Sequence, residues 1–135
     1  MRSSEDGFGT AINCIDGRAQ KPVADWLRSQ GIAYVDTVTD AGVDGVFAHG
    51  GSLEALRKNV GISVSAHKSP FIVVAGHHDC AGNPVSKAEH WNHIRTAVEI
   101  IRSWKLPVKN IAGLWVNERW EVEEIISCPG AAARS

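Results

Sequence analysis

The residues with the clearest chemical potential form two short groups that lie far apart in the sequence. The segment CIDGR places a thiol at Cys14, a carboxyl group at Asp16 and a guanidinium at Arg18. The segment HHDC places an imidazole at His77 and a second thiol at Cys80. If the chain stays extended after Cys14, the three side chains of the first group point to the same side, because strand faces alternate with period 2. Charged groups are rarely buried unpaired, so this group needs water or a partner.

The elements that would position these residues alternate between strands and helices. Apolar and β-branched runs predict five strands, at residues 8–15, 32–40, 70–76, 110–116 and 120–127. Helical spacing of apolar residues predicts three helices, at 19–31, at 53–61 with Ser52 as its N-cap, and from Pro84 to about 101. Residues 41–51 contain four glycines and are interpreted as a loop.

Alternating strands and helices predict an α/β fold, a small parallel sheet flanked by helices. We expect the strand order 2-1-3-4, with a fifth strand at the edge. In such sheets ligands bind at the carboxyl ends of the strands, where the winding changes direction. This point lies between the first and third strands, so Cys14 would face His77 and Cys80. Two thiolates and one imidazole suit Zn²⁺, and three protein ligands leave a fourth position open, as in catalytic sites.

Composition limits the classes of function. A chain of 135 residues with 44% hydrophobic residues predicts one globular domain covering 1–135. Fourteen basic and fifteen acidic residues give a net charge of −1, which predicts no nucleic-acid partner and no binding to a membrane. Three cysteines and no recognisable export signal predict a cytoplasmic protein, in which cysteines bind metals or catalyse reactions more often than they form disulfides.

The two motifs resemble those of the β-class carbonic anhydrases. Cys14–Arg18 resembles the family's C-x-D-x-R at the end of one strand, and His77–Cys80 its H-x-x-C at the end of a later strand. The resemblance extends over residues 8 to 126, with a short chain that differs at Gly17, where the family usually has Ser. It implies a β-carbonic-anhydrase-like fold and assembly as a homodimer or a dimer of dimers.

The same resemblance implies the chemistry. Zn²⁺ would be held by Cys14, His77 and Cys80, and Asp16 and Arg18 would form a catalytic dyad beside it. In one state Asp16 takes the fourth position on the metal; in the other it pairs with Arg18 and leaves room for water. The implied activity is hydration of CO2 to bicarbonate by zinc-bound hydroxide, a reaction on a small-molecule substrate.

Several alternatives stay open. The same site would serve a hydrolase acting on carbonyl sulfide or carbon disulfide, since these molecules are also small and uncharged. A zinc-binding protein without activity would have the metal blocked by a fixed fourth ligand. Taken without the neighbouring ligands, Asp16 and Arg18 favour a structural ion pair at a strand end. His90 and His93 are interpreted as a polar helix face, and the five tryptophans as anchors of a core or an interface.

Overall fold

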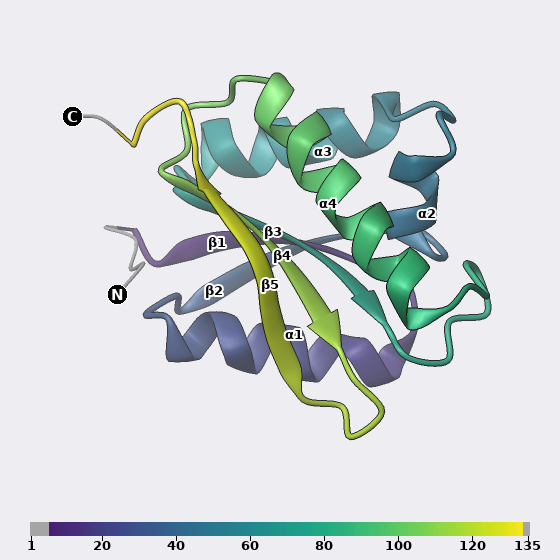
Figure 1. The fold of residues 1–135 in the computed structure, drawn as a ribbon. Helices are drawn as coiled ribbons and strands as arrows, with labels where there is room; N and C mark the ends of the chain where they lie inside the picture. Colours follow the sequence, from purple (N-terminus) through teal and green to yellow (C-terminus); the bar gives the residue numbers. More distant parts are fainter. Residues whose placement is uncertain (1–5, 134–135) are drawn as a thin grey trace.

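The computed structural model describes residues 6–133, which form one five-stranded sheet between two layers of helices (Figure 1). No helix in this described part is both long and apolar enough to cross a membrane. The elements in chain order are β1 (Phe8–Asn13), α1 (Gly17–Ser29), β2 (Tyr34–Thr39), α2 (Val43–Ala48), α3 (Glu54–Ala66), β3 (Phe71–His77), α4 (Lys87–Ser103), β4 (Asn110–Val116) and β5 (Val122–Pro129).

The sheet confirms the predicted strand order. Its order is β2-β1-β3-β4-β5; the first four strands are parallel, and β5 pairs with β4 in the antiparallel direction. The chain moves from β1 outward to β2, then crosses back to β3 on the other side of β1. The winding therefore changes direction between β1 and β3, and their carboxyl ends meet at one edge of the sheet.

Alternation along the strands divides the core into two clusters. Ile12, Ile72 and Val74 point to the face covered by α2, α3 and α4. Ala11 and Val73, each next in sequence to one of these, point to the face covered by α1. Figure 1 shows α1 alone on one side of the sheet and the other helices on the opposite side. Because both faces are covered, every residue of β3 is buried.

Three local predictions were wrong. Residues Val43–Ala48 form the short helix α2 rather than a loop, because Val43 and Phe47 lie one helical turn apart and both pack into the core. Helix α3 begins at Glu54, and Leu53 rather than Ser52 has the N-cap position, although the Ser52 hydroxyl still accepts a long hydrogen bond, 3.5 Å, from the Glu54 amide. Helix α4 begins at Lys87 rather than at Pro84, because the hydroxyl of Ser86 accepts a hydrogen bond from the Glu89 amide.

Candidate metal centre

Three buried side chains meet where β1 and β3 end. Cys14 follows the last residue of β1, His77 is the last residue of β3, and Cys80 lies in the loop after it. One ligand atom from each residue lies within 4.8 Å of the other two. Among the described residues this is the one cluster of three or more His, Cys, Asp or Glu side chains close enough to share a metal ion. The predicted juxtaposition of the two motifs is therefore present.

The imidazole of His77 has a free nitrogen inside this cluster. Its Nδ1 lies 2.7 Å from the carbonyl oxygen of His78. A carbonyl can only accept a hydrogen bond, so Nδ1 carries the hydrogen and the neutral ring keeps a lone pair on Nε2. That Nε2 is buried and has no hydrogen-bond partner. Buried polar atoms rarely lack a partner, so a metal ion on Nε2 fits what this ring leaves unsatisfied.

The two thiols also fit a metal ion. The Sγ atoms of Cys14 and Cys80 lie 3.9 Å apart, too far for a disulfide, and both cysteines are free. Two sulfurs that share one tetrahedral zinc ion at about 2.3 Å lie about 3.8 Å apart. Burial, and next the nearby Cys14, raise the pKa of the Cys80 thiol to about 11. Ionising the Cys80 thiol at neutral pH therefore requires a nearby cation.

Asp16 lies beside the cluster and is also the N-cap of α1. Its Oδ1 accepts hydrogen bonds from the backbone N and the Nε of Arg18, and its Oδ2 accepts one from Nη2 at 2.7 Å. The same Oδ2 is 3.9 Å from Nε2 of His77. The hydrogen bonds from Arg18 lower the pKa of Asp16 to about 2, so the carboxylate is ionised at neutral pH.

The route by which Arg18 reaches Asp16 differs from the prediction. The chain does not stay extended after Cys14, because α1 begins at Gly17 and Arg18 lies in its first turn. The side chain reaches back two residues to form the fork of hydrogen bonds with Asp16. The pair is thus both a helix cap and a charged group next to the cluster.

We call Asp16, Arg18, Asp79 and Trp120 the outer rim. The guanidinium of Arg18 donates from Nη1 to the carboxylate of Asp79 and from Nη2 to its backbone carbonyl, at 3.3 and 3.2 Å. Its Cζ atom lies 4.5 Å from the ring centroid of Trp120. The side chain of Arg18 is 50% exposed and that of Asp79 is 72% exposed. The rim therefore borders solvent, and it holds the charged groups of the site.

We call Gly42, Asp44, Gly82, Asn83 and His90 the inner wall. The Gly42 amide donates to Cys14 Sγ at 3.3 Å. Asp44 lies 2.5 Å from Nδ1 of His90 and accepts a second hydrogen bond from Asn83. Asp44 and His90 are 1% and 2% exposed. The wall therefore joins α2, α4 and the loop of Cys80 through buried polar contacts.

Sequence reasoning missed most of this support. His90 was predicted to lie on a polar helix face, but it is buried because it bonds to Asp44, 46 positions away. Trp120 was predicted to be an anchor of a core or an interface, and it does pack against the core cluster on the α1 face. Its contact with Arg18 from the β4–β5 turn was not predicted. Spacing within one helix does not show that two polar residues on different elements will meet. A signal for Trp120 did exist, because a tryptophan stands in a tight turn where glycine is usual.

Comparisons with known proteins agree with the fold. A family model described as "Putative carbonic anhydrase" matches residues 4–126. No curated protein matches the chain. Among solved structures, β-carbonic anhydrase isoform I from Trichomonas vaginalis superposes with a TM-score of 0.63 at 16% identity, covering 96% of this chain and 86% of that chain.

Two further structures are similar. A carbonic anhydrase from Streptococcus mutans has a TM-score of 0.60 at 18% identity, covering 87% of this chain and 81% of that chain. Tetrameric β-carbonic anhydrases from Sordaria macrospora have a TM-score of 0.52 at 16% identity, covering 90% and 82%. Likeness at these identities shows a shared fold.

Proposed function

Because the chain belongs to this carbonic anhydrase family, we propose that it hydrates CO2 to bicarbonate with Zn²⁺ held by Cys14, His77 and Cys80. One observation carries the proposal. An ionised carboxylate, Asp16, lies 3.9 Å from the unpartnered Nε2 of a buried histidine that shares its cluster with two thiols. A purely structural metal site has no need of a charged group held beside an open position.

The residues of the rim have separate tasks in the proposed reaction. Zinc, when bound, would act as a Lewis acid that lowers the pKa of water toward neutrality. Asp16 accepts a hydrogen bond from the attacking water and thereby turns an oxygen lone pair toward the carbon of CO2. Formation of the new C–O bond moves a C=O electron pair onto oxygen, and the proton leaves to solvent. A carboxylate that already accepts two guanidinium hydrogen bonds is a weak base, so Asp16 orients the water rather than keeping the proton.

We also propose that the chain pairs with a second copy of itself, as a homodimer or a dimer of dimers. Strand β2 is an edge strand. Tyr34 lies on it, Ile62 borders a hollow that β2 residues also line, and Ile15 follows β1, the strand that pairs with β2. These three are the exposed large hydrophobic residues of the described chain, with exposures of 51–64%. Light scattering at micromolar concentration should give at least twice the chain mass, and a monomer would contradict the pairing.

The first experiment tests the metal. Purified protein should contain about one zinc per chain, and Cys14→Ser should lose most of it because one of three ligands is changed. Cys128→Ser is the matched control, since Cys128 lies on β5 away from the cluster. Zinc retained at one per chain in Cys14→Ser would overturn the assignment of the ligands.

The second experiment tests the role of Asp16 with its capping function preserved. Asparagine is as good an N-cap as aspartate, so Asp16→Asn keeps the start of α1 while removing the charge. Zinc content should stay near one per chain, and CO2 hydration should fall at least about tenfold, within the range for a positioned polar group. Carbonyl sulfide should be assayed in parallel. Sulfide release without CO2 hydration would show that carbonyl sulfide is the substrate. Zinc-loaded protein that is inactive on both compounds would indicate a zinc-binding protein without activity.

A further inference from the structure

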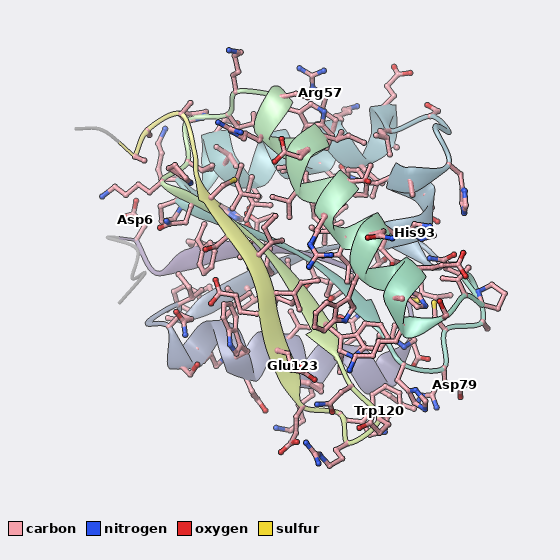
Figure 2. The ribbon with its side chains drawn as sticks, in the orientation of Figure 1. Asp6, Arg57, Asp79, His93, Trp120 and Glu123 are labelled. Atoms are coloured by element: carbon pink, nitrogen blue, oxygen red, sulfur yellow. The ribbon has the colours of Figure 1, made fainter. Side chains whose placement is uncertain are left out.

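Trp120 presents the face of its ring to the guanidinium of the candidate dyad. The Cζ atom of Arg18 is 4.5 Å from the ring centroid, within the range of a cation–π contact. The same ring is 6.1 Å from the ring of His77, between centroids. Figure 2 shows Trp120 and Asp79 at the same end of the molecule, and both residues contact Arg18. One side chain from the β4–β5 turn thus lies beside both the dyad and the cluster.

The backbone at Trp120 has a conformation that large residues rarely adopt. Its φ is +58°, in the left-handed region. The Trp120 amide donates to the carbonyl of Asn117 at 2.9 Å and closes a tight turn. A left-handed residue after such a turn is usually glycine, because a Cβ is unfavourable there. A bulky residue keeps this conformation only when its surroundings hold it, and such positions cluster at functional sites.

The turn itself does not need the tryptophan ring. Asn117 Oδ1 accepts hydrogen bonds from the backbone amides of Arg119 and Glu121, each at 3.0 Å, and its Nδ2 donates to Glu123. Asn117 is only 3% exposed, so these bonds are shielded from water. They fix the backbone around position 120, and glycine there would satisfy the same bonds with less strain. The ring must therefore be explained by what it contacts: the edge of the core on the α1 face, the rings of His77 and His78, and the guanidinium of Arg18, which is the one charged group among them.

We infer that Trp120 is a positioning residue that holds the Arg18 guanidinium in the orientation that binds Asp16. The two hydrogen bonds from Nε and Nη2 to the carboxylate form only when the guanidinium plane has one particular orientation. The side chain of Arg18 is half exposed, so water competes for its donors. An aromatic face stacked on the guanidinium restricts its rotation out of that orientation. The importance for catalysis rests on the proposed function, but the contact itself does not.

The test compares three variants. Trp120→Leu removes the aromatic face and keeps an apolar side chain, and Trp120→Phe restores an aromatic face. The matched control is Trp104→Leu. Trp104 is also partly buried beneath an arginine, Arg57, whose Cζ lies 5.6 Å from its ring centroid. Figure 2 places Arg57 at the opposite end of the molecule from Trp120.

The first readout is exchange of the Arg18 Nε hydrogen with water, followed by NMR in the zinc-loaded protein. The signal is identified by its absence in Arg18→Lys. We expect exchange to become about two- to fivefold faster in Trp120→Leu, the range of an exposed cation–π contact. It should be largely restored in Trp120→Phe and unchanged in Trp104→Leu. An unchanged Arg18 rate in Trp120→Leu would overturn the inference.

The second readout is a double-mutant cycle on CO2 hydration at unchanged zinc content. Trp120→Leu should lower turnover about two- to tenfold in the wild type and have no further effect in Arg18→Lys, because it acts through that guanidinium. If the turnover losses of Trp120→Leu and Arg18→Lys multiply in the double variant, Trp120 acts elsewhere and the inference is overturned. If the wild type does not hydrate CO2, the proposed function fails, whereas the exchange measurement still decides the position of Arg18.

Discussion

The inner wall and the outer rim border the same three side chains, but they hold their groups by different means. The wall uses a backbone amide, close glycine contacts and a buried Asp44–His90 pair. The rim uses a charged fork between Asp16 and Arg18 that borders solvent. Breaking a buried polar pair costs much stability, because the remaining partner is left unsatisfied, whereas breaking an exposed pair costs little. We therefore expect the wall to determine whether the site forms and the rim to determine what it does.

The largest effect on the free energy of unfolding is expected at Gly42. Its φ is +58°, and a Cβ there would lie 2.4 Å from the backbone carbon of Gly82. Gly42→Ala should therefore separate α2 from the Cys80 loop and destabilise the protein by at least about 3 kcal/mol. Gly50→Ala is the control, because Gly50 has a φ of +71° but no atom within 4 Å of the new Cβ. It should cost only about 1 kcal/mol in urea unfolding. Equal costs would show that the contact with Gly82 is unimportant.

A smaller loss of unfolding free energy is expected from Asp44→Ala, which leaves buried His90 without its acceptor and removes one of the two partners of Asn83 Nδ2, the other being Nδ1 of His93. The cost should be roughly 2–4 kcal/mol. The control is Asp36→Ala, since Asp36 also bonds to a histidine, His67, at 2.6 Å, and to the Ser63 hydroxyl, but the Asp36 and His67 side chains are partly exposed, so water can replace the carboxylate. That change should cost about 1 kcal/mol. The difference between the wall and a surface pair would be refuted by similar urea midpoints for the two variants.

On the rim, a small pH-dependent contribution is expected from Asp16. Its pKa is lowered from 3.8 to about 2 in the folded protein because Arg18 donates hydrogen bonds to it. A lowered pKa stabilises the folded state above pH 4, and this stabilisation is lost as the pH falls toward 2. In metal-free protein, the urea midpoint of wild type should therefore exceed that of Asp16→Asn by the largest margin at pH 5. The two midpoints should converge near pH 2. A gap that does not change with pH would contradict this assignment.

The smallest effect on unfolding is expected for Arg18→Lys, although its effect on turnover should be large. Lysine keeps the positive charge but loses the planar fork and the stacked contact with Trp120. The urea midpoint should fall by no more than that of Asp16→Asn, while CO2 hydration falls about tenfold or more. Lys21→Ala, which breaks an exposed ion pair with Asp25 on the same helix, should change neither. A midpoint in Arg18→Lys as low as that of Asp44→Ala would make the rim structural, like the wall.

The order of the strands and the meeting of the two motifs were predictable from local patterns. An uninterrupted apolar run such as residues 70–76 indicates a strand buried on both faces, and alternation with helices indicates a parallel sheet. Once β1 and β3 are neighbours, Cys14 must lie near His77 and Cys80. These conclusions depend on periodicity and on topological rules, both of which can be evaluated on a single sequence.

The wall was not predictable, because its contacts join residues whose local signals point elsewhere. Glycines at positions 42 and 45 indicate a loop, yet each is required where a Cβ would strike Gly82 or Asn83. His90 has the spacing of an exposed helical residue, and only its partner on α2 explains its burial. On the rim, the sequence shows a bulky residue at Trp120 in a turn, but a single residue has no period from which its partner could be inferred. Pairings between distant polar residues are decided by packing and are not encoded in local sequence.

The side chains of the cluster come from the carboxyl ends of two neighbouring strands that are far apart in the sequence, and this has a consequence for how the protein folds. Cys14 and Cys80 are 66 positions apart and meet only after β1 has paired with β3. Closing a loop of this length carries an entropic cost before any metal contact forms, so we expect ions to be captured late, after the transition state for folding. An interaction that forms late slows unfolding and leaves the folding rate nearly unchanged. Metal would thus lengthen the lifetime of the finished protein without helping a new chain to fold.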